Sequence, residues 1–235
     1  MEAIQPFRCV RTHTALKWGR IMRIYICGDS TAASYTQELA PLTGWGQVLG
    51  EYLPGVEIMN HAMAGRSTKS FLSEGRLQKV EEEIREGDLM LIQFSHNDGS
   101  DLVWRHTDPW GSFMNHLFIF VDSARLYGAV PVLLTPICVR SYQDHVLQES
   151  LGEYPEAVRV AARIRQVPLI DVYAKSREML TEMGEEESLK LYMQLDPGVW
   201  PGYPDGQKDN THTQLRGARA YAGLVADGLK GLKLI

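Results

Sequence analysis

Five short apolar runs, each followed by turn-forming or polar residues, constrain this chain more than any other feature of its sequence. The first, residues 24–27, reads Ile-Tyr-Ile-Cys and is followed at once by Gly28 and Asp29. Short, continuous apolar runs of this kind are typical of strands buried on both faces of a parallel sheet. We therefore expect five parallel strands, with the other four at residues 56–59, 88–94, 130–135 and 167–172.

Stretches with helical periodicity separate these runs. Residues 74–86 carry Leu77, Val80 and Ile84 on one stripe and end at Gly87. Strands that alternate with helices at this spacing form right-handed crossovers. The pattern therefore predicts an α/β fold, a three-layer α/β/α sandwich with a five-stranded parallel sheet. The other expected helices lie at residues 44–53, 113–127, 155–166 and 214–229, with two helical stretches between residues 174 and 193.

Net charge and cysteine content exclude several classes of protein. A net charge of −5 argues against a nucleic-acid-binding protein, which needs a basic surface. No apolar run approaches the roughly 20 residues of a membrane-spanning helix. The three cysteines, Cys9, Cys27 and Cys138, are an odd number at wide spacing, which indicates reduced thiols in a cytosolic protein. We expect neither a nucleic acid nor a membrane among its partners.

Residues 1–21 differ from the rest of the chain. They contain scattered basic residues and no apolar core of the length found in a secretory signal peptide. We expect these residues to form a poorly ordered or non-native extension and residues 22–235 to form a single domain. The same observation predicts a cytoplasmic protein.

A serine follows the first apolar run, and an acid and a histidine stand near the other end of the chain. Ser30 lies at the carboxyl end of the first expected strand, where open α/β sheets keep their ligand sites. Asp209 and His212 are three residues apart, a spacing that can present carboxylate and imidazole together on one helical turn. Ser30 or Asp209 alone could be a helix N-cap. Together, the three are the components of a nucleophile with its base and orienting group.

Two more polar loops follow expected strands. Residues 60–67 follow the second strand, and His96, Asn97 and Asp98 follow the third. Because the carboxyl ends of parallel strands meet at one edge of the sheet, we expect these loops to converge on Ser30. Asn97 could instead be a turn residue that bonds its own backbone. The histidines lack metal-site spacing and the first loop lacks a nucleotide-binding glycine pattern, so we expect no metal and no cofactor.

Taken together, these segments resemble the sequence blocks of the SGNH (GDSL-type) hydrolases, and within that superfamily most closely those of the rhamnogalacturonan acetylesterases. The resemblance spans about residues 22–230. Two positions depart from the family pattern: Ser95 stands where glycine is usual before His-Asn-Asp, and Ala64 where many relatives have a second glycine. The matching blocks are Gly-Asp-Ser-Thr at residues 28–31, Gly-Trp-Gly at 44–46, the stretch 60–67, the block 93–98 and Asp-x-Thr-His at 209–212.

The resemblance implies a flavodoxin-like fold and a serine esterase. It assigns the nucleophile to Ser30, the general base to His212 and the orienting acid to Asp209. It assigns the oxyanion hole to the backbone N–H groups of Ser30 and Gly65 and to the side-chain amide of Asn97.

The implied substrate is an O-acetylated oligosaccharide of pectic rhamnogalacturonan. Its galacturonate units carry carboxylates, so a local cation is needed, and the candidate substrate-binding residues are Arg66, Lys69, His96 and Arg140. One of Trp104, Trp110 and Trp200 could stack on a sugar ring. The alternatives are an esterase for another small acyl ester (an acetylated xylo-oligosaccharide, a lipid or a thioester) and a non-catalytic carbohydrate-binding relative.

Overall fold

The computed structural model describes residues 21–235, and its centre is the predicted five-stranded parallel sheet. The strands lie in the order β2-β1-β3-β4-β7, and every pairing is parallel. This is the flavodoxin-like order, with its topological switch point between β1 and β3. The strands are β1 (Arg23–Gly28), β2 (Glu57–Asn60), β3 (Leu89–Gln93), β4 (Val130–Leu134) and β7 (Leu169–Ile170).

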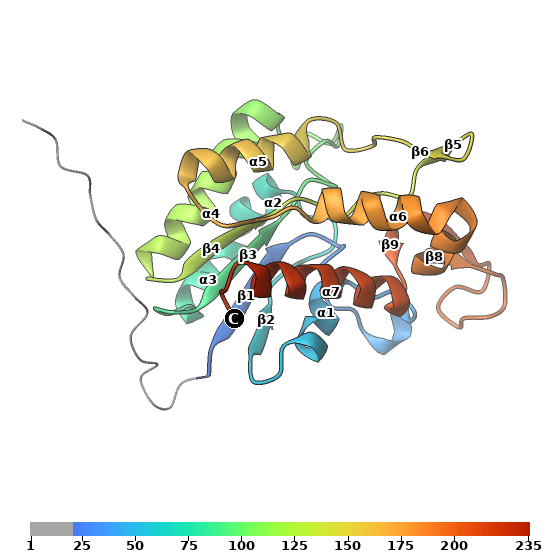
Figure 1. The fold of residues 1–235 in the computed structure, drawn as a ribbon, viewed down its shortest axis with the longest axis horizontal. Helices are drawn as coiled ribbons and strands as arrows, with labels where there is room; N and C mark the ends of the chain where they lie inside the picture. The colour runs from blue at the N-terminus through green and yellow to red at the C-terminus, as the bar shows by residue number, and fades with distance from the viewer. Residues whose placement is uncertain (1–20) are drawn as a thin grey trace, which may run out of the picture.

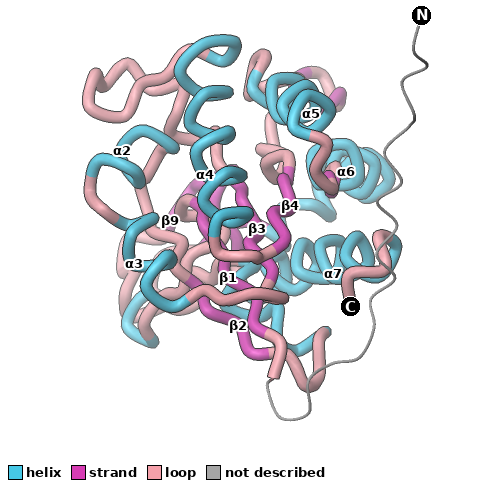
Figure 2. The backbone as a smooth tube through the Cα atoms, turned by 90° about the vertical axis from the view of Figure 1, so that its left-hand side faces the viewer, coloured by secondary structure: helices cyan, strands magenta, loops and turns pink. Residues whose placement is uncertain are grey.

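Helices cover both faces of the sheet, which confirms the predicted three layers (Figure 1). Alternate residues of β1 point to the two layers and are fully buried: Ile24 and Ile26 on one face, Tyr25 and Cys27 on the other. Figure 2 shows α7 on one side of the strands and α3 and α4 on the other. The layer packed on Ile24 contains α1 (Trp45–Val48), α6 (Val172–Ser188) and α7 (Leu215–Gly231), and the opposite layer contains α2 (Thr68–Ser73), α3 (Arg76–Glu83), α4 (Met114–Leu126) and α5 (Tyr154–Arg165).

Three helices differ from their predicted extents. The helix predicted at residues 44–53 is α1 followed by a 3-10 turn, η2 (Leu49–Tyr52). The helix predicted at residues 74–86 is the shorter α3, and the separate helix α2 before it was not predicted. A capping box between Ser67 and Ser70 starts α2. The helix predicted at residues 113–127 begins with a π-helical turn, η3 (Pro109–Phe113).

The largest difference from prediction follows α6. The predicted helical region reached residue 193, but α6 ends at Ser188, and after a 3-10 turn, η4 (Leu189–Leu191), the chain enters β8 (Tyr192–Leu195). This strand pairs antiparallel with β9 (Gln207–Thr213). Gly184 already interrupts the helical path inside α6 with φ 73°, and the buried side chains of Tyr192 and Leu195 suit a strand.

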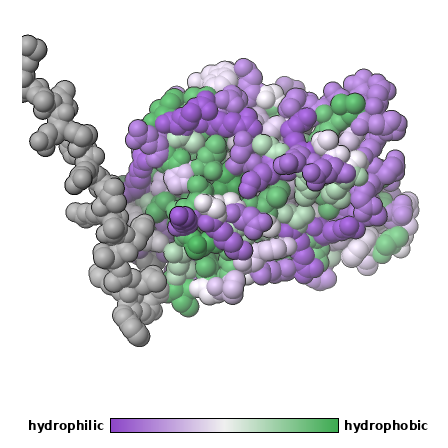
Figure 3. Space-filling model, viewed as in Figure 1, coloured by the Kyte–Doolittle hydropathy of each residue, from purple (hydrophilic) through white to green (hydrophobic). Residues whose placement is uncertain are grey.

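Smaller features complete the described chain. A 3-10 turn, η1 (Gln37–Leu39), and a short hairpin of β5 (Tyr142–Gln143) and β6 (Val146–Leu147) were not predicted. No helix within residues 21–235 is long and apolar enough to cross a membrane. On the face drawn in Figure 3, hydrophilic residues cover most of the surface. The predicted extension lies outside the described residues, apart from Ile21, and the assignment of residues 22–235 to one domain stays a prediction.

Candidate active site

Ser30 lies in a tight turn immediately after β1, at the carboxyl edge of the sheet. The turn is closed by a hydrogen bond from the Ala32 N–H to the Asp29 carbonyl (3.2 Å), and no α-helix begins there. Ser30 is therefore not a helix N-cap. Ser30 is only 6% exposed. The Tyr35 hydroxyl donates a hydrogen bond to the Ser30 carbonyl at 2.7 Å. The turn thus holds the serine in one place at the topological switch point.

His212 and Asp209 lie on β9, and His212, 182 residues further along the chain, contacts Ser30. The Nε2 atom of His212 lies 2.9 Å from Ser30 Oγ, and its Nδ1 atom lies 2.7 Å from Asp209 Oδ2. The expectation of a helical turn for this pair was wrong, because both residues lie on a strand. Asp209 Oδ1 accepts the backbone N–H groups of Thr211 (2.7 Å) and His212 (3.0 Å). The N-cap of α7 is Gln214, so Asp209 does not cap that helix.

The electrostatics of this pair suit a carboxylate that orients a base. The hydrogen bond to Asp209 raises the pKa of His212 against the opposing effect of burial. Burial pushes the pKa of Asp209 upward, but its hydrogen bonds from His212 and Thr211 outweigh this effect, and its pKa is lowered. With Asp209 ionised and bonded to Nδ1, the neutral ring carries its proton there, which leaves Nε2 free to accept the Ser30 proton.

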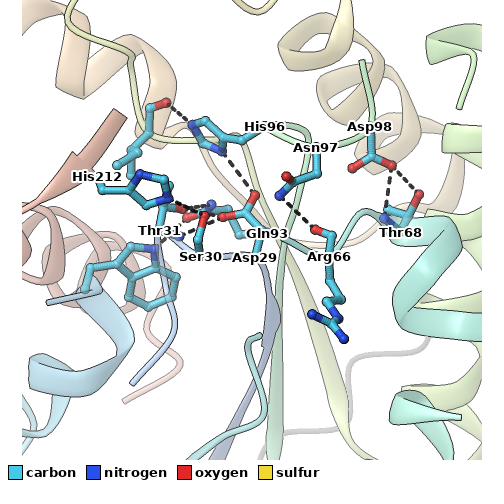
Figure 4. Close-up of polar contacts among 12 residues, drawn as sticks. Asp29, Ser30, Thr31, Arg66, Thr68, Gln93, His96, Asn97, Asp98 and His212 are labelled. Atoms are coloured by element: carbon cyan, nitrogen blue, oxygen red, sulfur yellow. Dashed lines mark hydrogen bonds and ion pairs between the residues drawn. The ribbon is translucent and has the colours of Figure 1, made fainter. Parts of the chain in front are cut away.

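Gly65 and Asn97 lie at the same edge of the sheet. Gly65 sits in the turn after β2 with φ +77°, and a Cβ there would meet nothing within 4 Å, so the backbone conformation rather than space favours glycine. Asn97 follows β3, and in the view of Figure 4, Ser30 lies between Asn97 and His212. Among residues 21–235, neither the Ser30 nor the Gly65 backbone N–H donates a hydrogen bond. These donors are free for a ligand.

A chain of buried hydrogen bonds supports the Ser30 turn. Trp45 Nε1 donates to Gln93 Oε1 (2.6 Å), Gln93 Nε2 donates to the Thr31 hydroxyl (2.8 Å), and that hydroxyl donates to Asp29 Oδ1 (2.7 Å). All of these side chains are at most 1% exposed. Because each member is satisfied, the chain fixes the turn in a single arrangement.

His96 continues this chain on the other side of Asp29. Its Nδ1 atom lies 3.1 Å from Asp29 Oδ2, and its Nε2 atom lies 3.1 Å from the Ile137 carbonyl (Figure 4). Both partners only accept, so a ring N–H is the donor in either hydrogen bond. Burial acts to raise the pKa of Asp29, but the charge of His96 and the bonds from Thr31 lower it.

Two glycines let α1 press against the segment that follows Ser30. A Cβ on Gly44 would lie 2.3 Å from the Ala33 carbonyl oxygen, and one on Gly46 would lie 2.5 Å from that of Ala32. Real Cβ atoms do not approach oxygen so closely, so the Gly-Trp-Gly block is required by this contact. The same block places Trp45 where its Nε1 joins the buried hydrogen bonds that support the Ser30 turn.

Comparison with known proteins now decides the family. Residues 26–224 match the model of the GDSL-like Lipase/Acylhydrolase family. The chain belongs to this family. It is 42% identical over 215 residues to the rhamnogalacturonan acetylesterase RhgT of Bacillus subtilis (strain 168), and the match covers 91% of each chain. It is 36% identical over 213 residues to the probable rhamnogalacturonan acetylesterase YesY of the same organism, and that match covers 90% of this chain and 94% of YesY.

A solved structure shares the fold of this GDSL-like acylhydrolase. The crystal structure of protein YxiM from Bacillus subtilis superposes with a TM-score of 0.76 at 25% sequence identity. The match covers 91% of this chain and 57% of that chain, so the present chain spans little more than half of its length. The predicted resemblance to the SGNH (GDSL-type) hydrolases and to the rhamnogalacturonan acetylesterases is thereby confirmed.

The two departures from the family pattern have different structural consequences. Ser95 has φ 136°, in the region that glycine favours, and its buried hydroxyl has no hydrogen-bond partner among residues 21–235. Ala64 is not among the described residues with positive φ. Glycine would therefore relieve a backbone constraint at position 95 but not at position 64.

The cationic candidates for substrate binding have different surroundings. Arg66 pairs with Glu74 (3.0 Å) and donates to the Ala64 carbonyl, and its side chain is 29% exposed. Lys69 donates to the Val103 carbonyl at 2.6 Å.

Arg140 is buried instead. It is only 7% exposed and donates to Ser188, Asn210 and the Glu185 carbonyl. Among the substrate candidates, then, Arg66 and Lys69 retain exposed surface, whereas the guanidinium of Arg140 and the ring of His96 are bonded within the protein. A packing role fits Arg140 better than a contact with substrate.

One residue beside the site was not predicted. Arg105, in the loop after β3, donates from Nη1 to Asn97 Oδ1 at 3.1 Å. No motif contains this arginine, and only the fold of the loop brings it to Asn97, so the sequence pattern offered no signal for it.

Proposed function

We propose that this chain is a serine esterase that removes O-acetyl groups from carbohydrate through an acyl-enzyme intermediate. The observation that carries this proposal is the pair of contacts from Ser30 Oγ to His212 Nε2 (2.9 Å) and from His212 Nδ1 to Asp209 (2.7 Å). A nucleophile in hydrogen-bond reach of a base that is itself oriented by a carboxylate is the arrangement that acyl transfer requires. A carbohydrate-binding protein would have no use for it.

In the first half of the proposed reaction, Ser30 Oγ attacks the acetyl carbonyl carbon while its proton passes to His212 Nε2. The carbonyl π electrons move to the oxygen and give a tetrahedral oxyanion. The N–H groups of Ser30 and Gly65 and the Asn97 amide receive this oxygen. Preorganised donors of this kind are each worth roughly 3 to 4 kcal/mol of barrier. Asp209 stabilises the imidazolium that forms.

The second half releases both products. The tetrahedral intermediate collapses, the bond to the sugar oxygen breaks, and His212 gives its proton to that oxygen, which leaves an acetylated Ser30. Water then gives a proton to His212 and adds to the acetyl carbon, and collapse of the second intermediate returns the proton to Ser30 Oγ and frees acetic acid.

The substrate class rests on the names of the relatives. Two proteins that are 42% and 36% identical to this chain over about nine-tenths of its length are called a rhamnogalacturonan acetylesterase and a probable one. We therefore propose acetylated rhamnogalacturonan oligosaccharides as the substrate and pectin degradation as the process. The oligosaccharide would need a cation beside its galacturonate carboxylate, and Arg66 is the candidate for that contact.

We also propose a cytoplasmic location. Cys27 and Cys138 are buried free thiols, which fits a reducing compartment. Cell fractionation with an antibody to the native protein tests this proposal. Recovery of the protein outside the cell would exclude it.

Hydrolysis of p-nitrophenyl esters tests the proposed chemistry. We expect the wild type to prefer acetate over butyrate and octanoate, and Ser30→Ala to abolish turnover of all three. Acetate release from acetylated rhamnogalacturonan oligosaccharides, compared with acetylated xylo-oligosaccharides, then tests the substrate. A preference for the longer acyl chains would overturn the carbohydrate assignment, and inactivity of the wild type on every ester would favour a binding protein.

A further inference from the structure

Arg105 makes a contact that decides which way the Asn97 side chain faces. Its Nη1 atom donates to Asn97 Oδ1 at 3.1 Å, and Asn97 Nδ2 donates to the Arg66 carbonyl at 3.2 Å. A guanidinium only donates and a backbone carbonyl only accepts. The reversed amide would place NH₂ against N–H and oxygen against oxygen, so only one orientation is satisfied. That orientation keeps the NH₂ group at the edge where Ser30 lies (Figure 4).

The loop that carries Arg105 is held in place at both ends. Thr107 donates from its N–H to the Asp98 carbonyl (2.9 Å) and from its hydroxyl to the Asp98 carboxylate (3.1 Å). The same carboxylate accepts the Thr68 N–H at 3.0 Å, which ties the loop to α2. Within the loop, the Arg105 N–H donates to the Leu102 carbonyl at 3.0 Å. These hydrogen bonds fix the loop in a conformation that places Arg105 next to Asn97.

Beyond its bond to Asn97, the guanidinium makes one aromatic contact within residues 21–235. Its carbon lies 5.3 Å from the ring centroid of Trp104, a residue that is 49% exposed. Its Nε–H is buried and has no hydrogen-bond partner in the described part of the chain. A buried unpaired donor costs free energy, and a cation–π contact with a half-exposed ring offsets only part of that cost, so the bond to Asn97 also contributes to holding the guanidinium in this position. The bond to Asn97 is the only side-chain bond that Arg105 makes within residues 21–235.

We propose that Arg105 is a positioning residue for the oxyanion hole, acting through the Asn97 amide. A charged donor on Oδ1 fixes the amide against rotation and polarises it, so that its N–H is a stronger donor toward negative charge on the acyl oxygen. Arg105 itself does not touch the reacting atoms. This inference rests on the proposed esterase function.

A double-mutant cycle on p-nitrophenyl acetate hydrolysis tests it. Arg105→Met keeps the length of the side chain and removes its donors. Because an oxyanion donor acts in the transition state, we expect kcat to fall about 10-fold with KM unchanged, and Asn97→Ala to lower kcat about 100-fold. The double variant should be no slower than Asn97→Ala alone, because Arg105 acts only through that amide. Arg105→Lys retains a charged donor and should recover part of the loss.

Controls separate this role from folding and from the esterase function. Arg23→Met removes a partly exposed cation paired with Glu57 (2.6 Å) at the amino end of β1, the end opposite Ser30, and should leave kcat unchanged. Thermal unfolding of each variant shows that it is folded. A kcat of Arg105→Met within twofold of the wild type, losses that multiply in the double variant, or a change in KM alone would each overturn the positioning role. Inactivity of the wild type on all esters would overturn the proposed function and this inference together.

Discussion

The imidazole of His96 lies 3.1 Å from the carboxylate of Asp29, and the two side chains, 4% and 0% exposed, form a buried pair beside the Ser30 turn. A buried carboxylate beside Ser30, the proposed nucleophile, would oppose the negative charge that develops on the acyl oxygen. Its pairing with His96 offsets the charge of the carboxylate and also joins the loops after β1 and β3. We therefore expect the pair to contribute to both stability and catalysis.

We predict that His96→Asn destabilises the protein far more than a matched change on the surface. The substitution removes the partner of a fully buried carboxylate, a change that typically costs about 3 to 5 kcal/mol. His145→Asn is the control, because His145 pairs with Glu185 at 2.8 Å but its side chain is 90% exposed. It should cost less than about 1 kcal/mol. Urea denaturation at pH 7 measures both, and similar costs would show that the buried pair contributes nothing special.

The pH dependence of activity should follow the His212–Asp209 pair. The pKa of His212 is raised by Asp209, so kcat/KM should increase with pH through a midpoint above 6.5, the ordinary pKa of histidine. Asp209→Asn removes this cause, and we expect the midpoint to fall and kcat to drop by orders of magnitude because the productive tautomer is lost. The pH profile of p-nitrophenyl acetate hydrolysis checks this. An unchanged midpoint in Asp209→Asn would contradict it.

Stability should have the opposite pH dependence for this pair. A histidine whose pKa is raised on folding stabilises the folded state fully below its unfolded pKa, and the contribution disappears as pH rises through the folded pKa. The lowered pKa of Asp209 keeps the carboxylate ionised throughout this range. The difference in unfolding free energy between wild type and His212→Ala should therefore be larger at about pH 5.5 than at about pH 8.5. These two pH values lie about one unit below and about two units above the ordinary pKa of histidine.

Ser95→Gly should stabilise the protein, whereas Ala64→Gly should not. At position 95 the change relieves φ 136° and removes a buried unbonded hydroxyl. These gains, about 1 to 3 kcal/mol each, exceed the roughly 1 kcal/mol of extra chain entropy that glycine loses on folding. Ala64 has no such constraint, so the same change there should cost up to about 1 kcal/mol. Differential scanning calorimetry of both variants tests the contrast, and a lower Tm for Ser95→Gly would refute it.

The sequence was sufficient to predict the sheet, its two helical layers and the loops that meet at its edge. This was possible because buried parallel strands such as β1 are short apolar runs, and because parallel strands end at one edge. It could not predict β8 and β9, since Tyr192, Met193 and Leu195 carry no period that separates a short strand from a buried helix end. Asp209 and His212 consequently lie on a strand, although their spacing also suits a helical turn.

The supporting contacts of the site were less predictable than its central residues. Ser30, Gly65 and Asn97 each stand in a recognisable block. The contacts of Arg105 with Asn97 and of His96 with Asp29 depend on loop conformation, which no local pattern encodes. Long-range hydrogen bonds between loops are set by the tertiary fold, so they become visible only when the loops are placed.

Arg66 and Arg140 should respond differently to substitution, although both were predicted to contact substrate. Arg66 is partly exposed beside Gly65, and Arg66→Ala should raise KM for an acetylated galacturonate oligosaccharide while sparing p-nitrophenyl acetate, which has no carboxylate. Arg140 is buried and bonded to three groups, so Arg140→Met should lower the free energy of unfolding by about 2 kcal/mol or more without selecting between substrates. Steady-state kinetics on both esters and urea denaturation measure these effects. Equal losses on both substrates for Arg66→Ala would remove it from the binding site, and a selective rise in KM for Arg140→Met at full stability would place Arg140 there instead.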